Sequence, residues 1–540
     1  MRTPSTTSLR ATAAAQDRDT LDIESAVVRF LRTGARINAD GNIVNAANEP
    51  LDLASVLESL PSRHKNATSK SKNKSAKDIC PAEYTQPFME FIDSSPTVFH
   101  AVSYFSKRLE GEGFVKLSER ECWQSKLKKG GKYFTTRNGS SIVAFSIPTA
   151  YEPGNGVAMA AGHIDALTAR LKPISKKPNS AGYVMLGVAP YAGGMNSTWW
   201  DRDLGVGGRV MVKTSDGKIE SRLVNLDWPI ARISTLAPHF GAAASGPFNK
   251  ETQMTPVIGL ENSEDEQLTM PAGTFAASQP ARLVKAISSE LGIQDYSSII
   301  NWELELYQFE PSRLGGLSKE LLFAPRIDDK LCSWAALEGV IEASKDLEGR
   351  GTVNACALFD DEEIGSQLRQ GARGNLLSGA VERIIEAFSK DGKAGANVVN
   401  QTYANSFLLS ADVTHAVNPN FLGSYLQDHS PKLNVGITVA ADPNGHMTTD
   451  AVSSALLQRI AEKSGHTLQV FQIRNDSRSG GTVGPMLSSA MGCRAIDAGM
   501  AQLSMHSIRA ACGSLDPGLG VQIFTGLYEH FESVDAEFAE

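Results

Sequence analysis

The sequence predicts an α/β fold with a mixed sheet, interrupted by a β-rich insertion and preceded by a separate extension. From about residue 321 to the C-terminus, short apolar runs alternate with helical patterns, which is typical of an α/β sheet. Before this part the composition shifts to Gly, Pro and Ser, and a basic stretch separates the folded chain from its N-terminal segment. We therefore expect four parts, with the second and fourth forming one catalytic domain: residues 1–75, 76–173, 174–320 and 321–540.

The composition excludes several classes of protein. The 540 residues are 41% hydrophobic and 21% charged, and 52 basic against 60 acidic side chains give a net charge of -8. A mildly acidic chain is a poor nucleic-acid binder, so we expect no nucleic-acid partner. No apolar run reaches about 18 residues, so we expect no membrane span. The six cysteines form no C-x-x-C pair, which favours a reduced, intracellular chain without a thiolate zinc site.

The N-terminal part contains one predicted helix and one predicted linker. Residues 19–33 place apolar side chains on one face of a short helix, and such a helix needs a partner surface because it is marginal alone. Residues 61–77 are basic and rich in Ser and Asn, which favours a flexible linker over a nuclear or nucleic-acid signal. Residues 1–16 carry no acid, and we favour a frayed terminus over a mitochondrial transit peptide.

The first folded part opens at Pro81 with a helical pattern that continues to about residue 113. KYFTTRNGSSIVAFSI then predicts a hairpin that turns at Asn138-Gly139, and GVAMAAGH predicts a strand that ends at His163. In the insertion, GRVMVKTSDGKIESRLV predicts a second hairpin at Asp216-Gly217. Residues 241–280 are polar and give few regular signals.

Five segments with acidic or histidine side chains each follow a short apolar run. They contain His163 with Asp165, Asp328 with Asp329, residues 360–363, Asp412, and His506. Loops beyond the carboxyl ends of strands form the site of an open α/β sheet, so we expect these five strand ends to converge. Unpaired buried carboxylates are costly, and two divalent metal ions are a compact way to compensate them.

The donor types favour zinc or a similar metal, because the set contains two histidines, several carboxylates and no cysteine. Asp165 can hold the second imidazole nitrogen of His163 and fix its tautomer. Of the adjacent Glu362 and Glu363, one can ligate metal while the other takes a proton from water. Plainer alternatives exist: Asp328-Asp329 can cap the following helix, and residues 360–363 can be a solvated acidic surface.

The ordered set of motifs resembles the M18 family of metalloaminopeptidases. The resemblance runs from about residue 82 to the C-terminus and rests on AGHIDALTARLKP, APRIDDKLCSWAA, LFDDEEIGS, LSADVTHAVNPNF, RSGGTVGP and AQLSMHSIRA. Four further stretches are similar to the fungal vacuolar branch of the family: KYFTTRNGSSIVAF, VAPYAGGMNSTWWDRDLGVGGR, LAPHFG and ADPNGHMTTD. The resemblance implies a mixed-sheet zinc-peptidase catalytic domain, an inserted β-rich dimerisation domain and a propeptide-like N-terminal extension.

The resemblance also implies the roles of the residues at the metal site. Two Zn2+ ions per subunit would be held by His163, Asp328, Glu363, Asp412 and His506. Asp328 would bridge both ions, Glu362 would be the general base, and Asp165 would orient His163.

On the substrate side, the resemblance points to two further segments. His239, in LAPHFG, would reach the site of a neighbouring subunit from the inserted domain. The loop with Gly480 and Gly481 would lie beside the substrate, although an ordinary Gly-rich turn is the alternative. His446 is a candidate because ADPNGHMTTD lies near the expected substrate pocket.

The implied activity is an exopeptidase that releases N-terminal residues from peptides by metal-activated attack of water. A pocket for acidic side chains needs a fixed cation, and the family's aspartyl-type enzymes carry a Lys in the segment 441–450. This segment has neither Lys nor Arg here, so we expect a preference for neutral, leucine-type residues. The alternatives are an aspartyl aminopeptidase of the same family and a self-assembling cargo scaffold of selective autophagy.

The resemblance implies a homododecamer delivered from the cytoplasm to the vacuole, with the cytoplasm as the alternative location. A selective-autophagy receptor would then bind the N-terminal segment.

Overall fold

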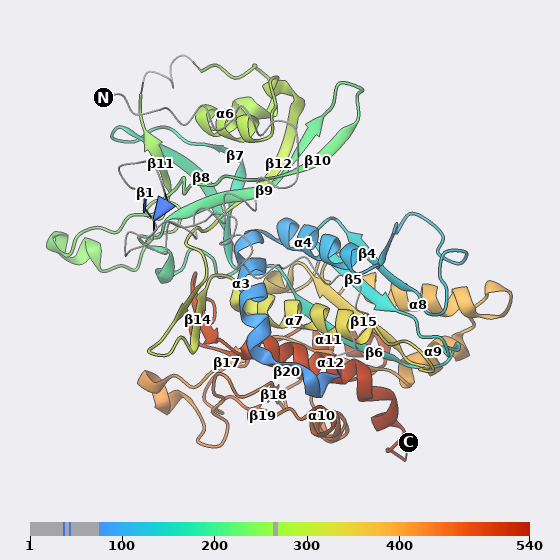
Figure 1. Ribbon diagram of the computed structural model, residues 1–540. Coiled ribbons are helices and arrows are strands. Elements are labelled where there is room, and N and C mark those ends of the chain that lie inside the picture. Colours follow the sequence, from blue (N-terminus) through green and yellow to red (C-terminus); the bar gives the residue numbers. More distant parts are fainter. Residues whose placement is uncertain (1–35, 38–42, 45–74, 263–267, 540) are drawn as a thin grey trace. The chain divides into compact units, whose positions relative to one another are not determined.

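The computed structural model describes residues 36–37, 43–44, 75–262 and 268–539 (Figure 1). The chain divides into two units, Met1–Lys72 and Asn73–Glu540. In the first unit, β1 (Arg36–Ile37) pairs antiparallel with β2 (Ile43–Val44). The helix predicted at 19–33 and the stretch 61–74 of the predicted linker lie outside the described residues.

A nine-stranded mixed sheet organises the second unit, which confirms the predicted fold class (Figure 1). In spatial order its strands are β19 (Gln469–Phe471), β18 (Thr438–Ala440), β20 (Arg494–Gly499), β16 (Phe407–Ser410), β6 (Val157–His163), β15 (Val353–Phe359), β5 (Ser141–Ser146), β4 (Lys132–Arg137) and β3 (Val115–Leu117). The four central strands β20, β16, β6 and β15 are parallel, and β5 is antiparallel to β15. The predicted hairpin is formed by β4 and β5, with Asn138 and Gly139 in the left-handed region at its turn.

Helices cover both faces of this sheet. On one face lie α3 (Thr85–Ser94), α4 (Val98–Gly111), α7 (Ile327–Ala343), α10 (Ala451–Ser464) and α12 (Asp516–Asp535). On the other face lie α8 (Leu376–Phe388), α9 (Ala396–Ala404) and α11 (Gly484–Met491). The strands β6 and β15 are buried along their whole length, which explains why their sequences are continuous apolar runs without alternation.

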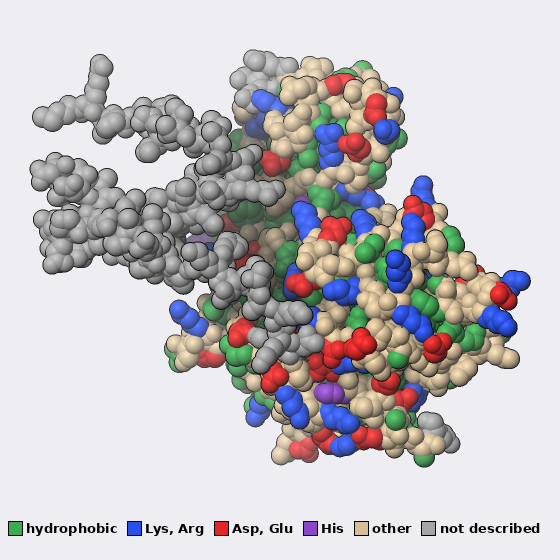
Figure 2. Space-filling view, turned by 45° about the vertical axis from the view of Figure 1, so that its right-hand side comes forward, with side chains coloured by type: hydrophobic (Ala, Val, Ile, Leu, Met, Phe, Trp, Pro, Cys, Tyr) green, Lys and Arg blue, Asp and Glu red, His purple; other side chains and the backbone are tan. Residues whose placement is uncertain are grey.

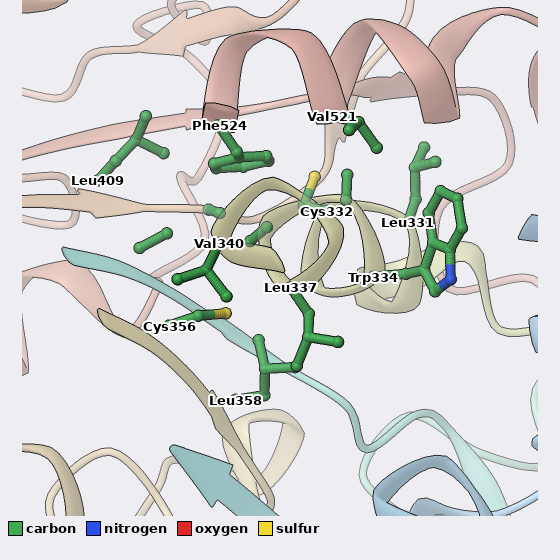
Figure 3. Packing of buried hydrophobic residues seen from close by; sticks show 14 of the residues in the cluster. Leu331, Cys332, Trp334, Leu337, Val340, Cys356, Leu358, Leu409, Val521 and Phe524 are labelled. Carbon is green, nitrogen blue, oxygen red and sulfur yellow. The ribbon is translucent and has the colours of Figure 1, made fainter. Parts of the chain in front are cut away.

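Helix α7 lies at the centre of the first helical layer and fixes the position of the residues that precede it. Leu337 and Val340 pack toward β15 and β16, while Cys332 faces α12 (Figure 3). A Cβ on Gly339 would lie 2.7 Å from the Cβ of Phe524, so this glycine lets α7 and α12 approach closely. A helix held on all sides gives its N-terminal end little freedom to move.

The insertion forms its own six-stranded antiparallel sheet. In spatial order the strands are β10 (Ile219–Asn225), β9 (Leu204–Lys213), β12 (Ile299–Gln308), β7 (Thr168–Lys176), β8 (Tyr183–Tyr191) and β11 (Val257–Leu260), and α6 (Ala281–Glu290) packs on them. Strands β9 and β10 form the second predicted hairpin. The sheet strands extend from residue 168 to 308, whereas the sequence assigns 174–320 to the insertion.

Two smaller sheets connect these parts. One contains β13 (Arg313–Gly315), β14 (Leu321–Ala324) and β22 (Ala510–Gly513), and the other contains β17 (Thr414–His415) and β21 (Ala501–Gln502).

Two local expectations need correction. The helical pattern from Pro81 forms two helices, because the segment Ser95-Pro96 interrupts it and the Thr97 side chain caps α4. The last residues of the predicted linker belong to the fold: Ala76 is fully buried, and its N–H donates to Glu529 Oε2 at 3.0 Å. Ala76 is small enough to pack against Gly526 of α12, a contact that composition does not reveal.

Both signs of charge are interspersed on the face seen in Figure 2. In the described part of the chain, no helix has the length and apolarity needed to cross a bilayer.

Candidate metal centre

Three of the five predicted segments follow neighbouring parallel strands of the central sheet. Strand β6 ends at His163, β15 precedes residues 360–363, and β16 precedes Asp412. The backbone carries the three strand ends close together: Ile164 N–H donates to Phe359 O at 2.8 Å, and Ala411 N–H donates to Ala161 O at 2.6 Å. These three segments therefore meet as the sheet topology predicts.

The other two segments reach the same place by different routes, which corrects the expectation of five equivalent strand ends. Asp328 follows β14, a strand of the three-stranded sheet, and lies at the start of α7. His506 comes after the short strand β21, in a turn where its own φ is 62°. Their positions depend on the packing of α7 and on a loop, and strand patterns do not predict either.

The five segments converge around Asp328. His163 Nε2 lies 3.3 Å from Asp328 Oδ1 and 3.7 Å from Asp412 Oδ1. On the other side, His506 Nε2 lies 3.6 Å from Asp328 Oδ2 and 3.8 Å from Glu363 Oε2. The two oxygens of one carboxylate thus face two different histidines.

Asp329 supports this arrangement from behind. Its Oδ2 accepts from the N–H of His163 at 3.4 Å, and its Oδ1 accepts from the N–H of Val413 at 3.2 Å. The carboxylate therefore joins α7 to the loops after β6 and β16. The backbone angles of Asp328 and Asp329 are non-helical, so the regular part of α7 begins after this pair, and the capping alternative is compatible with these contacts.

Asp165 organises three parts of the centre at once. Its Oδ1 lies 3.2 Å from His163 Nδ1 and accepts from the N–H of Glu362 at 3.2 Å. Its Oδ2 accepts from the N–H of Glu363 at 3.2 Å. Burial alone would raise the pKa of Asp165, but the bonds from His163, Tyr191 and the Glu363 N–H hold it below its usual value.

Tyr191, at the end of β8 in the inserted sheet, is a member of the site that the sequence does not reveal. Its hydroxyl donates to Asp165 Oδ2 at 2.7 Å and lies 3.3 Å from Asp361 Oδ1. The Arg170 guanidinium lies over its ring, 3.9 Å from the centroid. Both residues lie within quoted motifs, but only the pairing of β7 with β8 brings them beside Asp165.

The electrostatics of the centre show an excess of carboxylates. Burial raises the pKa of Glu362 to about 8, and the nearby charge of Asp412 adds to the effect. Burial, with the charge of Asp328, raises the pKa of Glu363 well above its usual range. Burial would lower the pKa of His163, but the surrounding carboxylates, Glu362 foremost, raise it.

These residues fit a metal centre with nitrogen and oxygen ligands. Ligand atoms of His163, Glu362 and Asp412 lie within 4.8 Å of one another, as do those of His163, Asp328 and Glu363. Glu363 Oε1 is buried and has no hydrogen-bond partner among the described residues. Mixed histidine and carboxylate sets are typical of zinc.

Comparison with known families agrees with this donor set. Residues 91–528 match the family described as "Aminopeptidase I zinc metalloprotease (M18)".

The chain belongs to the M18 family.

It is therefore a metalloaminopeptidase, as its motifs predict. Vacuolar aminopeptidase 1 of Saccharomyces cerevisiae is 45% identical over 468 residues, which cover 85% of this chain and 90% of that protein. An aspartyl aminopeptidase of Aspergillus oryzae is 39% identical over 477 residues, which cover 83% of this chain and 95% of that protein.

Solved M18 structures share the fold. The chain of Chaetomium thermophilum mApe1 is 55% identical, with a TM-score of 0.80 and coverage of 85% of this chain and 100% of that one. The Saccharomyces cerevisiae mApe1 dodecamer is 40% identical, with a TM-score of 0.75 and coverage of 85% and 99%. A chain from the Ape4 and Nbr1 complex is 37% identical, with a TM-score of 0.80 and coverage of 85% and 88%.

The expected substrate-side segments of this M18 chain border one hollow of about 670 Å³. His446 lines it, with its Nδ1 3.1 Å from Asp442 Oδ2, and Ser479 lines it next to the glycine loop. A Cβ added to Gly480 or Gly481 would meet no atom within 4 Å, so open space lies in front of both.

Asp497 on β20 ties the two substrate-side segments together, and no motif points to it. Its Oδ2 accepts from the N–H and hydroxyl of Thr448, and its Oδ1 accepts from the hydroxyl of Thr482 at 2.5 Å. Asp497 is 1% exposed, and burial raises its pKa.

In the single chain, His239 is not one of the described residues that form the metal cluster. It lies in the 3-10 segment η4 (Pro238–Ala244), which is exposed or nearly so throughout. Its neighbours Leu236 and Phe240 are 41% and 65% exposed. His239 therefore lies in an exposed loop with apolar neighbours.

Proposed function

We propose that the chain is a di-zinc exopeptidase that releases N-terminal residues from peptides. One observation carries the proposal: the two oxygens of Asp328 face His163 at 3.3 Å and His506 at 3.6 Å. A single carboxylate between two histidines is suited to bridge two ions. One ion would be held by His163, Asp328 and Asp412, and the other by Asp328, Glu363 and His506.

Zinc bound at these residues would supply Lewis-acid polarisation of the scissile carbonyl and activation of water. The ligand assignment above leaves Glu362 free for proton transfer. Its Oε2 lies 3.7 Å from His163 Nε2, and its carboxylate lies close to Asp412, so it is beside the metal ligands. It accepts a proton from the attacking water and returns it to the leaving amine. Asp165 keeps His163 and the Glu362 backbone in place for this step.

Metal titration tests the proposal directly. The protein is stripped with a chelator, dialysed, and titrated with Zn2+ while cleavage of a leucine-terminated peptide is followed. We expect activity to need two equivalents per chain. Full activity at one equivalent, or in the stripped protein, would remove the di-zinc assignment.

For the first residue of the substrate we propose a preference for neutral, leucine-type side chains. No Lys or Arg occurs in 441–450, and Arg474, which lines the hollow, is paired in two hydrogen bonds with Asp476. A second candidate is a preference for acidic residues, favoured by Arg478, which lines the same hollow, and by relatives that are aspartyl aminopeptidases.

A pair of substrates separates the two candidates. The leucine proposal expects a higher kcat/KM for Leu-terminated than for Asp-terminated substrates, and little change in Arg478→Gln. If Asp-terminated substrates are preferred and Arg478→Gln abolishes that preference, the second candidate is correct.

We also propose a homododecamer in which His239 completes the site of a neighbouring subunit, as the exposure of its loop and the related dodecamer support. Complementation tests this. Glu362→Gln and His239→Ala subunits, each inactive alone, are mixed and reassembled. A gain of activity in the mixed particles is expected, because some sites then receive an intact Glu362 and an intact His239. No gain would mean that His239 serves its own subunit or none.

The N-terminal segment, we propose, packages the particles for delivery from the cytoplasm to the vacuole through a selective-autophagy receptor. Repetition of one apolar helix on every subunit raises its effective concentration, and relatives include a vacuolar enzyme and a protein in complex with Nbr1. Deletion of residues 1–72 spares the Ala76 contact and should leave peptidase activity intact while abolishing clustering and delivery. Unchanged clustering and delivery would contradict packaging. An unmodified protein that stays in the cytoplasm would instead support the cytoplasmic alternative.

A further inference from the structure

A small cavity adjoins the metal cluster on the side of Asp328, Glu363 and His506. We call it the Arg326 cavity; its remaining walls come mainly from α7, the start of α4, and the strands β7 and β12 of the inserted sheet. Its volume of about 30 Å³ gives room for about two water-sized groups. A ligand there must be very small, or be the small polar end of a larger molecule.

Several buried polar atoms in the walls of the Arg326 cavity have no hydrogen-bond partner among the described residues. They are Trp199 Nε1, Gln308 Oε1, both amide atoms of Gln502, and Arg326 Nε and Nη1. Trp199, Gln308 and Gln502 are 1%, 4% and 1% exposed, so bulk water does not reach them freely. Buried polar groups are nearly always satisfied in native proteins, so their gathering in one cavity indicates a polar occupant.

The chemistry of the walls favours an anion away from the metal side. Arg170, Lys330 and Arg326 line the cavity against Glu305, which lies 3.8 Å from Arg170 Nε. Lys330 Nζ donates to Ile164 O at 2.7 Å. Arg326 uses only Nη2, which donates to Ile92 O at 2.9 Å, and leaves the Nε and Nη1 hydrogens for a ligand. Each of these free guanidinium hydrogens can donate a charge-assisted bond to a carboxylate oxygen.

We propose that the Arg326 cavity binds the C-terminal carboxylate of a dipeptide substrate. The inference rests on the proposed peptidase function, because the metal cluster then holds the first peptide group. One residue spans only about 3.3–3.6 Å, so in a dipeptide the terminal carboxylate lies one residue beyond the scissile bond. Longer peptides and amides place a neutral group there and lose this contact, so the cavity gives dipeptides an advantage over them.

The test compares Leu-Gly with Leu-Gly-amide, which differ only in the terminal charge. For the zinc-loaded dodecamer we expect kcat/KM to be at least about tenfold higher for the dipeptide acid, the effect of charge-assisted hydrogen bonds. Arg326→Gln should bring the ratio close to one. Leu-amide, which has no second residue, should be cleaved equally well by both proteins.

Two further variants distinguish a lost contact in the cavity from misfolding of the Arg326→Gln protein. Trp199→Phe keeps an aromatic side chain, smaller than the indole, and removes the Nε1 hydrogen; it should lower the ratio by about threefold, because one neutral donor is lost. Arg222→Gln on β10 is the control, since Arg222 does not line the cavity and pairs with Glu220 on the surface. Its ratio should equal that of the unmodified protein.

A binding measurement separates this inference from the proposed function. Leu-Gly and its amide are titrated calorimetrically into zinc-loaded Glu362→Gln protein, where turnover does not interfere. Tighter binding of the acid, lost in the double variant with Arg326→Gln, supports the inference even if neither peptide is cleaved. Equal binding and equal kcat/KM for acid and amide would mean that the cavity holds ordered water only. A ratio that Arg326→Gln and Trp199→Phe both leave unchanged would place the carboxylate elsewhere, and would also overturn the inference.

Discussion

The metal cluster and the Arg326 cavity lie side by side and differ in the charges that line them. The metal cluster gathers the carboxylates of Asp328, Glu362, Glu363 and Asp412 around two histidines. The cavity shares Asp328 and Glu363 with the cluster, and its other walls bring the cations of Arg170, Lys330 and Arg326 together with Asp165 and Glu305. Among the described residues, the carboxylates of the metal cluster form ion pairs with histidine only. In the cavity, Arg326 and Lys330 donate to backbone carbonyls, and Arg170 lies near Glu305.

This difference determines what each region requires from outside the chain. Four carboxylates in a desolvated space need cations of high charge, because protons alone would leave them unable to act as ligands or bases. The cavity leaves only a few donor atoms unpaired, so one small anionic group suffices. A dipeptide on two zinc ions would meet both requirements.

The largest expected effect on kcat comes from replacing one carboxylate of the metal cluster by an amide of the same size. Glu362→Gln should lower kcat by about 10²–10⁴-fold, because the amide cannot accept a proton from water. Zinc content, measured by elemental analysis of the same sample, should stay normal, since Glu362 is not assigned as a ligand.

An exposed glutamate of the insertion provides the control for this variant. Glu251→Gln, whose side chain is 61% exposed, should leave both kcat and zinc content unchanged. A Glu362→Gln protein that keeps more than about a tenth of the normal kcat at full zinc content would contradict the general-base assignment.

The two regions also differ in how far the sequence predicts them. His163, Asp412 and the acidic run at 360–363 follow apolar strands, and parallel strand ends meet at one edge, so their convergence is predictable. Asp328 and His506 are found by their motifs, but their positions depend on the burial of α7 and on a turn after β21.

Several residues of the Arg326 cavity lie within the quoted motifs, but nothing in the sequence places them together. Arg170, Glu305 and Trp199 come from the inserted sheet and its loops, and Arg326 and Lys330 from the start of α7. They meet only because two elements far apart in sequence pack together. The strand ends of the central sheet do not point to Tyr191 or Asp497 either, because Tyr191 ends a strand of the inserted sheet and Asp497 lies inside β20.

Tyr191 contacts both regions: its hydroxyl bonds Asp165, and its ring lies against Arg170. Tyr191→Phe keeps the ring beneath Arg170 but removes the bond to Asp165, which in turn holds His163. Zinc affinity should fall by about tenfold, the lower end of what such supporting partners contribute. Competition with a zinc chelator measures it.

A remote tyrosine serves as the control for Tyr191. Tyr403→Phe also removes a buried hydroxyl, one that donates to Ser378 O at 3.2 Å, and should leave zinc affinity unchanged. Equal zinc affinity in the Tyr191→Phe protein would show that Asp165 needs no support from the insertion.

A buried ionisable group outside both regions affects stability and not the site. Burial lowers the pKa of His466 from 6.5 to about 4, and its Nε2 accepts from the N–H of Ile437 at 2.9 Å. Because the unfolded chain takes up this proton at higher pH than the folded one, stability is lost as pH falls from 6.5 to 4, by about 2 kcal/mol at pH 5.

His466→Gln should remove this part of the acid sensitivity. The difference in free energy of unfolding between pH 7 and pH 5, from urea titrations of both proteins, should be smaller in the variant. Parallel pH profiles would show that His466 does not titrate differently in the two states.

The bridging role of Asp328 is the central claim, and metal stoichiometry tests it most directly. Zinc per chain is measured by elemental analysis after exhaustive dialysis, with Asp346→Ala on the surface as the control. We predict two ions in the unmodified and control proteins, about one in His506→Ala, and none in Asp328→Ala. Two ions retained in Asp328→Ala would contradict the account, because no shared carboxylate would then hold the centre together.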